Sequence, residues 1–187
     1  MVLNLKKGQR VEVGLRKVRL GLGWNPNSTS GAPFDLDVSL CLLQSGKVVE
    51  DGHFIFYNNL ASPDGSVRLE GDSLDGAGDG DDEVAHVDLT QVASRVEEIL
   101  VVVSIHEYEE RKQNFGQVRN SYIRITDESN GTELCRYELD EDFSIESAVE
   151  FGRLYRKADT WRFEAVGRAF NGGLQYVVDQ YYAVSEG

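Results

Sequence analysis

The residues best suited to chemistry lie in one acidic, glycine-rich stretch, GDSLDGAGDGDDE, at residues 71–83. Together with Glu70, this stretch holds seven carboxylates and no basic residue. Neighbouring carboxylates repel one another by roughly 1 kcal/mol per close pair even in water, so we expect a positive charge to reach the stretch from outside it. The glycines let backbone carbonyl groups turn inward beside the carboxylates. Hard oxygen donors on a curved backbone are typical of Ca²⁺ sites, which take about six to eight oxygens.

Two other interpretations of the acidic stretch compete with calcium. Acidic glycine-rich loops are commonly just solvated. Known calcium motifs fit poorly, because an EF-hand that starts at Asp79 has Val84 where the sixth-position glycine belongs. A single glycine-aspartate copy also cannot build a calcium-binding β-roll. The close spacing of Asp79, Asp81, Asp82 and Glu83 favours a bound cation over a solvated loop.

Further oxygen donors occur at the ends of apolar segments elsewhere in the chain. Asp35 and Asp37 in FDLDV share one face of a strand, and aspartate is disfavoured in strands, although surface strands also carry such pairs. The amides of Asn58 and Asn59 are either ligands or turn formers. Glu107 follows the most hydrophobic strand and is a further candidate, while the neighbouring His106 is expected to be structural.

Most of the chain has the pattern of short strands. The β-rich segments span residues 11–23, 35–43, 53–57, 66–70, 84–88, 99–105, 119–126 and 132–139. Asn130-Gly131 predicts a hairpin. A second hairpin is expected to join 147–156 to 160–170 through residues 157–159, with a bulge or an end at Gly167.

Two segments have helical spacing. In residues 89–100, Thr90 is a candidate cap and Val92, Val96 and Ile99 mark one face. In residues 172–182, apolar side chains recur at the spacing of a helix packed on a sheet. The sequence therefore predicts a mainly β protein, a β-sandwich of two sheets with one or two peripheral helices and an acidic calcium-binding loop, as one domain over residues 1–187.

Composition limits the partners. A net charge of −13 and a pI near 4.6 disfavour nucleic acid and anionic lipid. The sequence has no signal peptide and no long apolar run, which predicts a cytoplasmic protein without direct membrane insertion. Cys41 and Cys135 lie in separate apolar stretches and are expected to be buried reduced thiols.

Catalytic motifs are missing from the sequence. We find no nucleophile elbow, phosphate-binding loop or dinucleotide fingerprint. The imidazoles are His53, His86 and His106, which lie within or beside apolar strands and are poor candidates for catalysis. We therefore expect no enzymatic activity. The alternative is a metal-dependent hydrolase or nucleotide-binding protein that uses the same acidic cleft.

Several motifs, in order along nearly the whole chain, resemble the TerD-type tellurite-resistance and stress-response family. They are FDLDVSL (34–40), FIFYNNL (54–60), the acidic stretch, ILVVVSIHE (99–107), QNFGQVRNSYIRI (113–125), and VEFGRLYR (149–156) with WRFEAVGRAFNGG (161–173). The chain departs from the common family pattern at Ser73 and Asp75, where Asn and Thr are more usual, and at Glu107, where Asp is commoner.

The resemblance implies a bacterial, cytoplasmic β-sandwich that holds two nearby Ca²⁺ ions in an acidic cleft. It also implies partners among other tellurite-resistance and stress proteins, including a complex at the inner membrane. Combined with the donors noted above, the predicted metal ligands are Asp35, Asp37, Asn58, Asn59, Asp72, Asp79, Asp81, Asp82, Glu83 and Glu107. The expected function is a non-enzymatic calcium-binding module that acts through a calcium-ordered surface.

Overall fold

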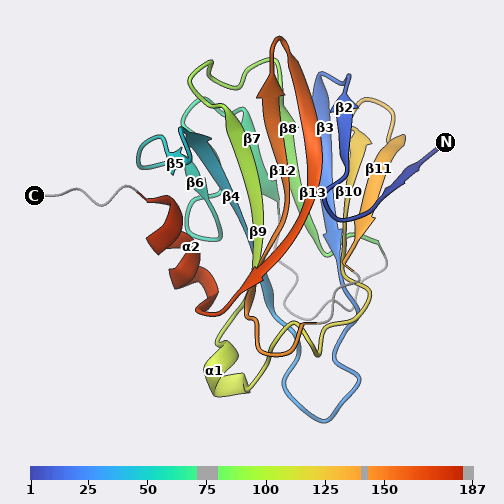
Figure 1. Ribbon diagram of the computed structural model, residues 1–187, viewed down its shortest axis with the longest axis vertical. Coiled ribbons are helices and arrows are strands. Elements are labelled where there is room, and N and C mark those ends of the chain that lie inside the picture. The colour runs from blue at the N-terminus through green and yellow to red at the C-terminus, as the bar shows by residue number, and fades with distance from the viewer. Residues whose placement is uncertain (71–79, 140–142, 183–187) are drawn as a thin grey trace, which may run out of the picture.

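Two β-sheets pack face to face in a computed structural model of the protein, which describes residues 1–70, 80–139 and 143–182 (Figure 1). This arrangement confirms the predicted β-sandwich. Only two helices accompany the sheets in the described ranges, and both are short. No helix in this part of the chain is both long and apolar enough to cross a bilayer.

The first sheet has six strands in the order β1-β11-β10-β3-β8-β7. Its strands are β1 (Leu3–Leu5), β3 (Lys17–Gly23), β7 (Val67–Glu70), β8 (Glu83–Asp88), β10 (Tyr122–Asp127) and β11 (Glu133–Glu138). All neighbours are antiparallel except β1, which runs parallel to β11 at the edge. The predicted hairpin at Asn130-Gly131 joins β10 to β11 and is confirmed, with Gly131 at a positive φ of 74°.

The second sheet has seven strands, ordered β2-β13-β12-β9-β4-β5, with β6 also paired to β4. Its strands are β2 (Arg10–Val13), β4 (Leu36–Gln44), β5 (Lys47–Val48), β6 (Phe54–Ile55), β9 (Glu98–Ile105), β12 (Ala148–Lys157) and β13 (Thr160–Phe170). The predicted hairpin of β12 and β13 is confirmed. The register shifts opposite Gly167, whose φ is 66°, so the strand bulges there rather than ending.

Alternation along the strands separates the core from the outer faces. Leu20 and Leu22 of β3 point into the sandwich, and so do Leu36 and Val38 of β4, all four among the core residues. Period-two alternation therefore places Arg19 and Gly21 on the outer face of the first sheet. By the same rule, Asp37 lies on the outer face of the second sheet.

The prediction of a helix within residues 89–100 is wrong. The segment forms turns and then enters β9 at Glu98. The Asp88 carboxylate accepts bonds from the backbone N–H and hydroxyl of Thr90, which makes a turn. The Arg156 guanidinium donates to the carbonyl oxygens of Val92, Ala93 and Val96, and so satisfies groups that a helix would have paired internally.

The structure also differs from the predicted elements in smaller ways. The strand predicted over 11–23 is split into β2 and β3. A one-turn helix, α1 (Tyr108–Arg111), follows β9 and carried no helical signal long enough to predict it.

The predicted C-terminal helix is confirmed as α2 (Gly173–Tyr181), which lies against the outer face of the second sheet (Figure 1). Val177 is buried, and Leu174 and Val178 pack with it on a second apolar cluster beneath the helix. Glu150 of β12 is also buried there, where its carboxylate accepts hydrogen bonds from Tyr181 and Arg168. The hydrogen bond from Tyr181 to Glu150 thus connects α2 to β12 of the second sheet.

Four strand ends lie at the same end of the sandwich, and acidic residues lie in or beside three of them, at Asp35 and Asp37, Glu83 and Glu107 (Figure 1). The four strand ends are the end of β3, the start of β4, the start of β8 and the end of β9. The loop between β3 and β4 and helix α1 lie at this end too. We call it the acidic end.

We expect Tyr181→Phe to lower the free energy of unfolding by about 1.5–3 kcal/mol, because a hydrogen bond to the buried Glu150 carboxylate is lost. Urea unfolding followed by circular dichroism measures the change. Tyr57→Phe is the matched control, since Tyr57 is exposed. Equal effects of the two substitutions would contradict the role assigned to the Tyr181–Glu150 contact.

Candidate functional site

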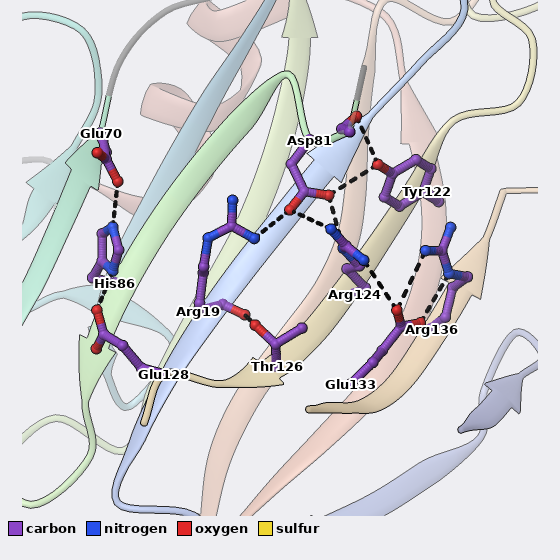
Figure 2. Close-up of polar contacts among 11 residues, drawn as sticks. Arg19, Glu70, Asp81, His86, Tyr122, Arg124, Thr126, Glu128, Glu133 and Arg136 are labelled. Atoms are coloured by element: carbon purple, nitrogen blue, oxygen red, sulfur yellow. Dashed lines mark hydrogen bonds and ion pairs between the residues drawn. The ribbon is translucent and has the colours of Figure 1, made fainter. Parts of the chain in front are cut away.

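Asp81 is held by two arginines from other strands. Its side chain is fully buried on the outer face of the first sheet, where Arg124 donates to both carboxylate oxygens at 2.8 and 3.0 Å (Figure 2). Arg19 pairs with the same carboxylate, and the Tyr122 hydroxyl donates to it at 2.9 Å. The positive charge that this carboxylate needs is therefore supplied by the protein.

A missing side chain makes room for the Asp81 carboxylate. A Cβ at Gly21 would overlap the carboxylate oxygens, so only glycine fits at this position of β3. The backbone beside Asp81 is fixed as well, because Gly80 has a φ of 104° and the Asp82 N–H donates to the Leu22 carbonyl at 2.7 Å. These contacts fasten the beginning of β8 to the end of β3.

Burial and hydrogen bonding act in opposite directions on Asp81. Burial raises the pKa of the carboxyl, but hydrogen bonds from Arg124, Tyr122 and Arg19 outweigh it, so the pKa lies below its usual value. Burial and the bond to Asp81 raise the pKa of Tyr122 to about 12. Asp81 is therefore ionised and Tyr122 neutral at physiological pH.

Other charged pairs continue across this outer face. Arg124 also contacts Glu133 at 3.1 Å, and Glu133 contacts Arg136 at 2.9 Å (Figure 2). Farther along the face, the His86 ring lies between the carboxylates of Glu70 and Glu128. His86 thus belongs to a row of polar side chains in contact across this face.

Asp82 and Glu83 lie at the acidic end, at the entry to β8. The Asp82 carboxylate accepts a bond from the Trp24 N–H at 2.9 Å. The Trp24 indole in turn donates to the Phe34 carbonyl at 3.2 Å, immediately before Asp35. Glu83 is only 2% exposed and shares the inward-facing side of β8 with Ala85. Trp24 therefore connects the acidic residues of the first sheet to those of the second.

Asp35, Asp37 and Glu107 form the other side of the acidic end. Asp37 lies opposite Ser104 in the β4–β9 pairing, and its carboxylate is 3.3 Å from Nδ1 of His106. The other ring nitrogen of His106 is 3.5 Å from Glu107. Arg111 of α1 contacts Glu107 at 3.2 Å and Asp35 at 3.9 Å. The three predicted ligands are thus grouped around one histidine and one arginine.

Asn58 and Asn59 follow β6. The Asn59 side-chain amide donates to the carbonyl oxygens of Gly52 and Phe54, and its backbone pairs with Phe56. This is the behaviour of a turn-forming residue, which was one of the two roles expected for it. Asn58 is exposed beside it.

The structure does not bring all the predicted ligands to one point. Asp37 and Asp81 lie on the outer faces of opposite sheets, and sheets pack about 10 Å apart, so one ion cannot bind both. Asp72 and Asp79 lie outside the described residues. Within residues 1–70, 80–139 and 143–182, no three acidic, histidine or cysteine side chains are placed to hold a metal ion.

The sequence analysis did not identify the arginines that contact the acidic residues of this site. Arg19 and Arg124 are far from Asp81 in the sequence, and Arg111 lies on a helix that was not predicted. A signal was present in the strands, since Arg19 and Gly21 alternate with core residues on β3. Tyr122 and Arg124 alternate in the same way on β10, which is paired with β3.

Both cysteines are buried free thiols, as predicted. Burial, reinforced by nearby glutamates, raises the pKa of Cys41 well above its usual value. Burial and Glu133 raise the pKa of Cys135 to about 12. Neither thiol is therefore ionised at neutral pH, and thiolate chemistry needs the ionised form.

Comparison with protein families and curated proteins gives consistent matches. The TerD domain matches residues 1–181. The tellurium resistance protein TerD of Serratia marcescens is 48% identical over 97% of both chains. General stress protein 16U of Bacillus subtilis is 46% identical, also over 97% of both chains.

Comparison with solved structures supports the fold. A homologue of the telluride resistance protein TerD from Streptomyces coelicolor superposes with a TM-score of 0.70 at 22% identity, covering 89% of this chain and 96% of that one. A second crystal structure, of a protein of unknown function, has a TM-score of 0.65 at 27% identity and covers 83% of this chain and 92% of that one.

Gly21→Ala is expected to lower the free energy of unfolding by about 2 kcal/mol, because the new methyl group displaces Asp81 from its arginines. Gly14→Ala is the matched control, since no atom lies within 4 Å of its added Cβ. Chemical denaturation measures both. A Gly21→Ala protein as stable as the Gly14→Ala protein would show that the carboxylate is not packed against Gly21.

The lowered pKa of Asp81 predicts an acid-sensitive contribution to stability. That contribution is complete above the unfolded-state pKa of about 3.9 and is lost as the pH falls through the lower folded-state pKa. Asp81→Asn should therefore cost about 2 kcal/mol at pH 7, and the deficit should shrink below about pH 4. Denaturation at a series of pH values tests this, with Asp159→Asn at the exposed hairpin turn as the control. A deficit independent of pH would contradict the assignment.

Proposed function

We propose that this chain, which belongs to the TerD family, is a non-enzymatic Ca²⁺-binding module. The relatives named in the preceding section are tellurium-resistance and general stress proteins. The ions would bind at the acidic end. Asp35, Asp37, Asp82, Glu83 and Glu107 would be ligands, together with Asp72 and Asp79 of the acidic stretch.

The convergence of separate acidic segments at one end of the sandwich is the observation that carries this proposal. Asp35 precedes β4 and Asp37 lies in it, Glu83 begins β8, and Glu107 follows the end of β9. Trp24 links the two groups through bonds to Asp82 and to the Phe34 carbonyl. Glu83 and Asp35 are nearly inaccessible to solvent, and carboxylates in such places are stabilised by cations.

The donor chemistry fits calcium. Carboxylate and carbonyl oxygens are hard ligands that suit Ca²⁺, which tolerates irregular geometry better than Mg²⁺ does. Thiolates favour softer metals, but both cysteines are buried. His106 contributes an imidazole at this end, beside Asp37. Asp81 is left out of the ligand set, because its carboxylate is already neutralised by Arg19 and Arg124. We assign Asp81 to positioning Asp82 and Glu83.

A bound divalent ion would supply the positive charge that allows these carboxylates to approach one another. The role of the chain is then to hold its donors in place. Asp81 and the Leu22 carbonyl fix the entry to β8, and Trp24 fixes it relative to β4. Ion binding would stabilise this end of the sandwich and present its loops to a partner. We propose partners among other tellurite-resistance and stress proteins, including a membrane-associated one, for a protein that acts in the cytoplasm.

Redox detoxification of a tellurium oxyanion is not supported by the chemistry of the chain. Reduction by thiols needs accessible thiolates, whereas Cys41 and Cys135 are buried with raised pKa values. A net charge of −13 also repels anions at long range. These observations favour a binding role over an enzymatic one.

Calorimetric titration with Ca²⁺ tests the proposal. We expect saturable binding of two ions and, at a hundredfold excess over Kd, stabilisation of about 2.7 kcal/mol. Asp82→Asn combined with Glu83→Gln should weaken binding by about tenfold or more, because two hard ligands are lost. The control Asp159→Asn should leave binding unchanged.

Two results would contradict the proposal. The first is the absence of any binding heat from a folded protein, together with a melting temperature that Ca²⁺ leaves unchanged. The second is metal-dependent hydrolysis of a nucleotide or phosphate ester that the same double substitution abolishes, which would support a hydrolase instead.

A further inference from the structure

A pocket of about 680 Å³ opens beside the acidic end, between the loop from β3 to β4 and the segment that follows α1. The β3–β4 loop and the segment that follows α1 both run at that end of the molecule in Figure 1. The volume is within the range of about 300–1,000 Å³ that is typical of small-molecule sites. One wall belongs to the QNFGQVRN motif (113–120), to which neither the fold nor the calcium proposal gives a role.

Hydrogen bonds between the walls hold the pocket open. The Gln113 side chain donates to the carbonyl oxygens of Ala32 at 2.7 Å and of Pro33 at 3.3 Å. The Asn25 N–H donates to the Arg119 carbonyl at 2.9 Å. Within the first wall, the Asn27 amide donates to the Ala32 carbonyl at 2.8 Å. The pocket is therefore preorganised and not a gap between unconnected loops.

The charge of the pocket is opposite to that of the protein. Arg111, Lys112 and Arg119 line it, and none of its lining residues is acidic, although the chain carries a net charge of −13. Arg111 shares its charge with Glu107 and Asp35.

Across the ranges that the structure describes, no ion pair involves Lys112 or Arg119, although Nη1 of Arg119 donates to the backbone carbonyl oxygens of Gly116 and Val118. The positive charges of both side chains are therefore not neutralised by a carboxylate of the described residues, and the other guanidinium N–H groups of Arg119 can reach a ligand. An isolated cationic pocket on an acidic surface selects anions.

A buried acceptor lies among these cations. Gln113 is 6% exposed, and its Oε1 has no hydrogen-bond partner among the described residues, while its Nε2 is occupied by the opposite wall. A buried acceptor left without a donor costs free energy, and a ligand hydroxyl group could satisfy it. The Phe34 ring is only 4% exposed, so the pocket offers no open aromatic face for a nucleobase to stack on.

We propose that this pocket binds a small phosphate ester that carries hydroxyl groups, with the chemistry of a sugar phosphate. Lys112 and Arg119 match the two negative charges of a phosphate monoester. Oε1 of Gln113 accepts a bond from a hydroxyl group of the ligand. The site adjoins the proposed calcium ligands through Arg111 but uses none of them as a contact, so the proposal does not depend on calcium binding.

Calorimetry on the full chain in a phosphate-free, calcium-free buffer tests this proposal, with ribose 5-phosphate, inorganic phosphate and ribose as probes. We expect saturable binding of ribose 5-phosphate, weaker binding of inorganic phosphate and no binding of ribose. Lys112→Gln combined with Arg119→Gln should weaken binding of the ester by roughly tenfold or more, because two charge-assisted contacts are lost.

The matched control is Arg16→Gln combined with Lys157→Gln, which removes two exposed positive charges at the other end of the sandwich. It should bind the ester like the unmodified chain, and melting curves confirm that both double variants are folded. The proposal is overturned if a folded protein gives no saturable heat at millimolar ester, or if the control loses as much affinity as the pocket variant. Equal affinity for ester and inorganic phosphate would overturn the role of Gln113. Binding of inorganic phosphate without binding of the ester would overturn the ligand class.

Discussion

Burial of the Asp81 carboxylate between Arg19 and Arg124 is the interaction on which the acidic end depends. The three residues come from β3, β10 and the entry to β8, and the absence of a side chain at Gly21 leaves room for the carboxylate beside β3. A buried charge whose partner is removed is strongly destabilising. Loss of this contact is therefore expected to destabilise the protein, and residues 81 and 82 are held on the sheet by contacts within the chain itself.

The position of Asp81 determines where the neighbouring acidic residues lie. Asp82 and Glu83 follow Asp81 directly, and Trp24 joins Asp82 to Phe34, which immediately precedes Asp35 and β4. Rigid strand ends thus present oxygen donors from both sheets, which is the preorganisation that a cation site needs. Arg111 lies where the proposed calcium ligands and the cationic pocket meet, since it contacts Glu107 and also lines the pocket.

Local patterns in the sequence were enough to predict the sandwich, both hairpins, a bulge or an end at Gly167, and helix α2. Each follows from periodicity or turn chemistry within one segment. The failed helix in residues 89–100 had suitable spacing, but Arg156, some 60 residues away, takes its carbonyl groups. The partners of Asp81 escaped prediction for the same reason, because strand order decides which distant residues become neighbours, and a single sequence does not state that order.

The most direct test of the account is long-wavelength anomalous diffraction from crystals grown with Ca²⁺. The account predicts anomalous peaks at the acidic end, between the start of β4 and the start of β8, with Asp82 and Glu83 among the ligands and Asp81 still bound to Arg19 and Arg124. A map without peaks at that end, or with an ion beside Asp81 on the outer face of the first sheet, would contradict it.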